Sequence, residues 1–135
     1  MTALDWTPSS ADEPEDPAQT RLRPGAVRRL GKHATVRLTA HGSAPVTVFV
    51  AGDIDLACAD ELGAVLRTAL DGYPQGIDLD LASVRFCDCL GLRTLLAVGA
   101  CAGRLGRHFA LGPHSPAIAR LLELTGAQSV LAITD

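Results

Sequence analysis

Two cysteines, Cys87 and Cys89, stand on either side of Asp88, a spacing that makes metal binding or thiol redox chemistry conceivable. A zinc site needs two more ligands, and Cys58 and Cys101 both lie in apolar segments with helical periodicity, where small buried thiols are common. A thiol at a helix N-terminus has its thiolate stabilised by the local positive potential, so a redox role for Cys89 is favoured over metal binding. Structural thiols are favoured over both.

Signatures of catalysis are missing from the sequence. It contains no Gly-x-Gly-x-x-Gly, no Walker loop, no His-Glu-x-x-His and no Gly-x-Ser-x-Gly. None of the four histidines has helical spacing from a cysteine or carboxylate, as a metal site would require. We therefore predict a protein that is not an enzyme and has no catalytic residues, metal or cofactor.

Composition predicts one soluble globular domain. Of the 135 residues, 47% are hydrophobic and 20% are charged, and the formal net charge of −3 gives no global basic field for nucleic acid. No apolar run approaches the roughly 20 residues of a membrane-spanning helix, and the first residues do not resemble a secretion signal. We expect a cytoplasmic protein that binds neither nucleic acid nor membranes directly.

Charge divides the N-terminal part of the chain. Residues 1–20 carry five acids and no base, whereas residues 21–37 carry six bases and no acid. Such a polar segment, which also contains several prolines, buries too little apolar surface to offset its ordering entropy. We predict a disordered extension over residues 1–32, with a folded domain over 33–135. A tail that folds over the acidic domain is favoured over one that binds phosphate groups.

In the remaining residues, the spacing of hydrophobic side chains alternates between a period of two residues, typical of strands, and one of 3.6 residues, typical of helices. The predicted elements are strands over 34–39 and 46–51, a helix ending near 71, a strand over 77–81, a helix over 91–105, a strand over 108–111, a helix over 116–125 and a strand over 130–133. The order β-β-α-β-α-β-α-β predicts an α/β domain with a small mixed sheet of about five strands flanked by helices. Asp88 is placed to cap the second helix, and Gly91 gives that helix a bare first turn that another surface can approach.

The segment Asp80-Leu-Ala-Ser-Val-Arg-Phe-Cys-Asp-Cys-Leu-Gly-Leu-Arg-Thr-Leu-Leu resembles the signature of STAS domains, in particular bacterial anti-sigma factor antagonists. Three further stretches resemble the family in order and spacing: Val48-Phe-Val-Ala-Gly-Asp-Ile-Asp-Leu-Ala, the helix that begins near Asp60, and Ser115-Pro-Ala-Ile-Ala-Arg-Leu-Leu-Glu-Leu-Thr-Gly. The resemblance covers residues 34–133 and implies a STAS fold.

The resemblance also implies a partner and a switch. Such domains bind an anti-sigma factor with a histidine-kinase-like ATPase fold, which phosphorylates a Ser or Thr immediately before the glycine that matches Gly91. In this chain that position is Leu90, which has no hydroxyl, so the usual phospho-switch is not expected. The docking surface implied by the resemblance comprises Asp53, Asp55, Asp88, Cys89, Leu90, Gly91 and Arg93. For the three acids, helix capping is an equally supported alternative.

Two other functions stay open at this point. One is a redox or small-ligand sensing STAS module that uses the Cys87–Cys89 loop. The other is a scaffold subunit in a larger signalling assembly, and a homodimer is also an open alternative.

Overall fold

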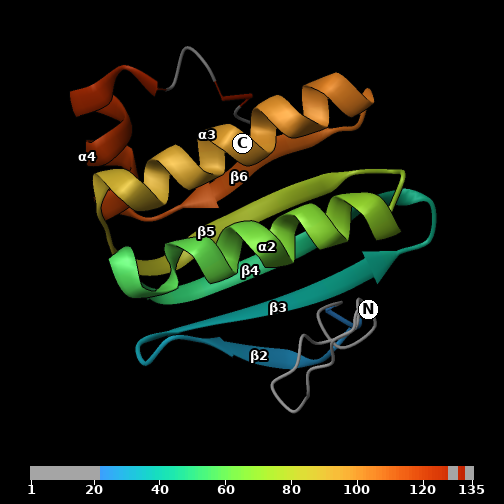
Figure 1. The fold of residues 1–135 in the computed structure, drawn as a ribbon, viewed down its shortest axis with the longest axis horizontal. Coiled ribbons are helices and arrows are strands. Elements are labelled where there is room, and N and C mark those ends of the chain that lie inside the picture. The colour runs from blue at the N-terminus through green and yellow to red at the C-terminus, as the bar shows by residue number, and fades with distance from the viewer. Residues whose placement is uncertain (1–21, 128–130, 133–135) are drawn as a thin grey trace, which may run out of the picture.

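The computed structural model describes residues 22–127 and 131–132, and its core is a five-stranded sheet. Helices α2 and α3 lie side by side over one face of that sheet, and α4 packs against β5 (Figure 1). The elements are β2 (Val27–Leu30), β3 (Ala34–His41), β4 (Ala44–Ile54), α2 (Leu56–Gly72), β5 (Ile77–Cys87), α3 (Cys89–Leu105), β6 (Phe109–His114) and α4 (Pro116–Thr125). None of the helices among the described residues is long and apolar enough to cross a membrane.

The sheet is mixed, as predicted. Its strand order is β2-β3-β4-β5-β6; the pairs β2/β3 and β3/β4 are antiparallel, and β4/β5 and β5/β6 are parallel. A short turn joins β3 to β4 and permits the antiparallel pair, whereas the two parallel pairs require the crossovers that α2 and α3 provide. The predicted α/β class with about five strands is confirmed.

The N-terminal edge differs from the prediction. Strand β2 lies inside the segment expected to be disordered, and it pairs with β3 from Val27 opposite Arg37 to Leu30 opposite Ala34. Leu22 and Leu30 are buried in the core, which explains why this highly charged segment is ordered. The predicted disorder is therefore wrong for residues 22–32, which belong to the folded domain. The expectation of disorder over residues 1–21 lies outside the described residues.

The C-terminal strand predicted over residues 130–133 lies only partly within the described residues. Residues 130 and 133 lie outside the described part, and Leu131 and Ala132 are not assigned to a strand. The Leu111 N–H nevertheless donates to the Ala132 carbonyl at 2.7 Å, and Leu131 is buried. These two residues thus lie against the β6 side of the sheet.

The core lies between the sheet and the two helices that cover it. In β5, Ile77, Leu79 and Leu81 are buried, while Asp78 and Asp80 point to the other face and stay half-exposed. The apolar residues of α2 follow helical spacing and are buried throughout: Leu62, Val65, Leu66, Ala69 and Leu70. Each fully buried aliphatic side chain stabilises the fold by about 1.5–3 kcal/mol, so matching stripes on α2 and the strands fix the helix over this face.

Candidate docking surface

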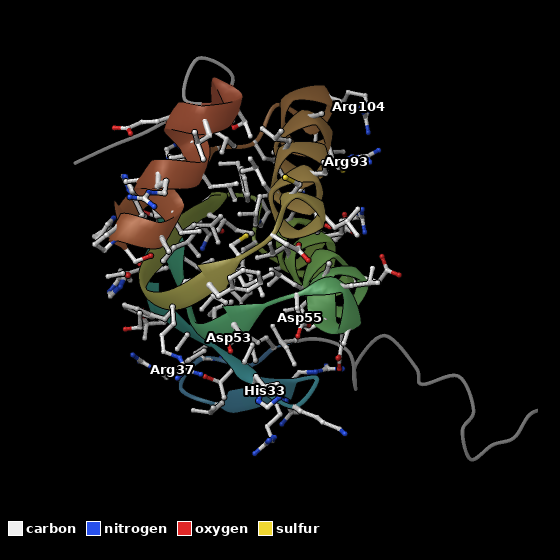
Figure 2. The ribbon with its side chains drawn as sticks, turned by 90° about the vertical axis from the view of Figure 1, so that its left-hand side faces the viewer. His33, Arg37, Asp53, Asp55, Arg93 and Arg104 are labelled. Atoms are coloured by element: carbon white, nitrogen blue, oxygen red, sulfur yellow. The ribbon has the colours of Figure 1, made fainter. Side chains whose placement is uncertain are left out.

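The beginnings of α2 and α3 meet at one end of the sheet because strands β4 and β5 are parallel. Ile54, the last residue of β4, pairs with Cys87, the last residue of β5. One residue further on in each case, Asp55 and Asp88 cap the two helices. The Asp88 N–H also donates to the Ile54 carbonyl at 3.2 Å, which ties the two helix starts together. Figure 2 shows Asp53 and Asp55 at this end of β4.

Two of the three acids named in the sequence analysis have a structural role. The Asp55 carboxylate accepts from the Ala57 N–H at 3.0 Å, and the Asp88 carboxylate accepts from the Gly91 N–H at 2.8 Å. Such caps satisfy N–H groups that have no partner inside the helix, and each contributes about 0.5–2 kcal/mol. Capping therefore accounts for both residues without a partner protein.

Asp53 does not cap a helix. Its carboxylate lies 3.4 Å from the Arg85 guanidinium in an exposed pair, which contributes at most about 1 kcal/mol. Its N–H donates to the His33 carbonyl at 2.9 Å, so the β2–β3 turn is attached to the end of β4. Asp53 thus lies beside the two helix starts but is engaged with Arg85.

Gly91 does not have the predicted role. It is buried, and a Cβ atom added to it would lie 2.8 Å from both the Cys87 Sγ and the Ile54 Cγ2. The missing side chain lets the first turn of α3 pack directly on the ends of β4 and β5. The bare turn therefore faces the core, and the expectation that another surface approaches through it is wrong.

Leu90 and Arg93 lie on the opposite, outer side of this turn. Leu90 is 39% exposed, and Arg93, three residues later, shares its face of the helix. Both line a shallow hollow of about 290 Å³ between α2 and α3, together with Leu56 at the start of α2. Figure 2 shows Arg93 pointing from α3 into solvent. Cys89 is exposed at the first position of the helix.

Exposed apolar side chains line two separate hollows near this helix start. Leu56, Phe86 and Leu124 are 69%, 50% and 78% exposed. Phe86 and Leu124 line a second hollow of about 430 Å³ between the end of β5 and α4, and among the described residues that line it Arg120 alone is charged. Clustered exposed apolar side chains mark sites of protein interaction. We refer to the following set as the α3-start surface: Leu56, Phe86, Cys89, Leu90, Arg93 and Leu124.

The thiols do not form a reactive pair. Cys87 is buried, and its burial, together with the charge of Asp88, raises the pKa of the thiol to about 12. Burial also raises the pKa of Cys58. Since the thiolate is the reactive form, Cys87 is inert at neutral pH. Within the described ranges no cluster of His, Cys, Asp and Glu is arranged to hold a metal ion.

The raised pKa of Cys87 predicts a loss of stability in alkali. Above pH 9.0 the unfolded chain releases the Cys87 proton while the folded protein retains it until about pH 12. The free energy of unfolding should therefore fall with rising pH in this window, by up to about 1.4 kcal/mol per pH unit. Urea titrations of the wild type and Cys87→Ala at several pH values measure the slope. Equal slopes in the two proteins would contradict a raised pKa for Cys87.

Comparison with known proteins gives matches over most of the chain. A family model described as "Mlab, STAS domain" matches residues 31–132. An anti-sigma factor antagonist from Mycobacterium paratuberculosis has 26% sequence identity and a TM-score of 0.65, with 74% of this chain and 84% of the other covered.

Two forms of a further protein share the fold at lower identity. Unphosphorylated SpoIIAA, an anti-sigma factor antagonist, has 16% identity and a TM-score of 0.62 over 74% of this chain and 88% of its own. The phosphorylated form of SpoIIAA, described as a Bacillus cell fate determinant, has 17% identity and a TM-score of 0.57, covering 74% and 91%.

Proposed function

Because the chain belongs to the STAS domain family, we propose that it is an anti-sigma factor antagonist that binds an anti-sigma factor and thereby frees a sigma factor. In this role it is a binding protein and not an enzyme. The observation that carries the proposal is the α3-start surface, where Leu90 and three further apolar side chains are exposed near one helix start. Structural similarity to anti-sigma factor antagonists supports the general role.

The chemistry of the surface indicates what the partner must present. Leu56, Phe86, Leu90 and Leu124 offer apolar area, while Arg93 and Arg120 lie at its two hollows. A complementary partner buries aliphatic or aromatic side chains here and carries acidic groups opposite the arginines. We propose that this partner is an anti-sigma factor with a histidine-kinase-like ATPase fold.

Leu90 determines how the interaction is regulated. In the proposed complex its side chain occupies the position at which relatives would be phosphorylated, and it cannot accept a phosphoryl group. The nearest hydroxyl on α3, that of Thr94, belongs to a half-buried side chain that packs close to Gly63 of α2. Ser83 is exposed but lies on β5, before the helix. We propose that binding is constitutive and does not depend on ATP.

The proposal is tested with the kinase-type anti-sigma factor of the same host. Added to a complex of that protein with its sigma factor, the chain should release the sigma factor equally well after preincubation with or without ATP. Labelled ATP should leave the chain unlabelled, because no hydroxyl occupies position 90. The Leu90→Ser variant should become labelled and lose its binding, since a phosphoryl group adds about −1.5 to −2 charges.

Two outcomes contradict the proposal in different ways. Failure to release the sigma factor in either condition would overturn the antagonist function. Label on the wild-type chain that disappears in Ser83→Ala or Thr94→Ala would leave the function in place and overturn the absence of a switch.

A further inference from the structure

Cations gather at the β2 edge of the sheet. Within residues 22–37, Arg23, Arg29, Lys32 and Arg37 are exposed, and no acidic residue interrupts them. Val27 lies opposite Arg37 and Arg29 lies opposite Thr35 in the β2/β3 register, so these side chains share one face. Their neighbours Val36 and Leu38 are buried on the other face, toward the helices. Arg29 and Arg37 therefore belong to the face that α2 and α3 leave uncovered.

This face also has an apolar component. Val27 is 63% exposed, and the Arg37 guanidinium lies 4.3 Å from the centre of the Phe49 ring. Both line a hollow of about 150 Å³, which Asp80 and Ser83 close on the β5 side. We refer to Val27, Arg29, Arg37 and Phe49 as the basic face; Lys32 lies in the turn that follows β2, where its carbonyl accepts from the Arg29 guanidinium at 3.0 Å. The basic face fits a segment that carries both carboxylates and an aromatic side chain.

Residues 1–20 of the same chain have this composition. They contain Asp5, Asp12, Glu13, Glu15 and Asp16, no cation, and Trp6. We propose that this acidic segment binds the basic face of its own chain, with carboxylates on Arg29 and Arg37. The inference does not depend on the proposed function, because none of the residues involved belongs to the α3-start surface.

The point at which the described chain begins supports this occupant. Leu22 is buried, and the Gly25 N–H donates to the Leu38 carbonyl at 2.8 Å, so the acidic segment is attached next to β3 and Arg37. Twenty residues span at most about 70 Å when extended, which is ample to reach the basic face. A short tether also holds the segment at an effective concentration on the order of millimolar.

The interaction should be electrostatic and therefore sensitive to salt. Individual exposed ion pairs are weak, but several carboxylates on one tethered segment act together. The Debye length falls from about 30 Å at 0.01 M salt to about 3 Å at 1 M, so salt should release the segment. Added salt would not release a segment held mainly by apolar contacts.

Trp6 provides the probe because it is the only tryptophan in the chain. In the full-length protein, its fluorescence anisotropy should be high at low salt and should fall as salt is added. The double variant Arg29→Gln/Arg37→Gln should lose most of this fall. The matched control Arg67→Gln/Arg104→Gln removes the same charge from exposed positions on the helices and should keep it. Figure 2 shows Arg104 on α3, far from Arg37 and His33.

A second variant keeps the test independent of the stability of the domain. This variant changes only the acidic segment and carries four substitutions: Asp12→Asn, Glu13→Gln, Glu15→Gln and Asp16→Asn. It should abolish the salt-dependent fall in Trp6 anisotropy, as the basic-face variant does. Equal anisotropy changes in the basic-face variant and its control would overturn the proposal. So would a fall that depends on protein concentration, because the segment would then bind a second copy.

Discussion

In the Leu90→Asp variant, the affinity for the proposed anti-sigma factor partner is expected to fall by about 30-fold or more. A carboxylate at the centre of an apolar interface is buried without a partner, and central contact residues typically cost 2 kcal/mol or more, where about 1.4 kcal/mol corresponds to a tenfold change. The fold should be unaffected, because Leu90 is 39% exposed and an acid in the first turn of a helix is favourable. Titration calorimetry measures the affinity.

Leu105→Asp is the matched control for this variant. Leu105 is 46% exposed and ends the same helix, outside the α3-start surface. Its substitution should change the affinity by less than about threefold, since rim and distant residues contribute little. An equal loss in the two variants would show that charge on α3 weakens binding wherever it is placed, and the specific role of Leu90 would be refuted.

The Gly52→Ala variant is expected to lose more than about 3 kcal/mol of stability, which is a large part of the stability of a small domain. Gly52 has a φ of +96°, and a Cβ atom there would lie 2.0 Å from the His33 carbonyl oxygen. That oxygen is backbone, so relief requires β3 and β4 to separate where Gly52 pairs with Ala34. The left-handed conformation adds strain of about 1–3 kcal/mol.

Gly103→Ala is the control for the glycine substitution. Gly103 lies in α3 with nothing within 4 Å of an added Cβ, so alanine should stabilise the protein by about 0.5–1 kcal/mol through its higher helix propensity. Denaturant titration of the two variants should move the unfolding midpoints in opposite directions. A Gly52→Ala midpoint equal to that of the wild type would contradict the assigned packing.

Much of the fold was predictable from the sequence because its determinants are local. The apolar stripe of α2 and the alternation of Ile77, Leu79 and Leu81 are periodic patterns, and the structure buries all of them. Asp88 was predicted as a helix cap, and it accepts a backbone N–H in the first turn of α3, as Ser115 does for α4. Residues that satisfy neighbouring backbone groups leave a signal in the sequence itself.

The features that the sequence did not reveal depend on contacts between distant segments. β2 contains Arg28 and Arg29 and looked like part of a solvated tail, but an edge strand needs only one pairing partner and two buried leucines. Gly91 looked like an open turn, yet it packs against Ile54 of another strand. Phe86 follows Leu81, the last β5 residue that pairs with β6, and its side chain is half-exposed beside α4, which periodicity does not predict.

The most direct test of whether the α3-start surface binds the partner is an NMR titration. Unlabelled anti-sigma factor is added to the isotope-labelled chain, and the changes in its amide chemical shifts are recorded. We predict that the largest changes occur at Leu56, Phe86 and Cys89–Arg93, with the α4 amide of Leu124 also affected. Val27 and Arg37 of the basic face and Leu105 at the other end of α3 should be unaffected. Changes confined to those three residues, with none at Leu90, would contradict the account.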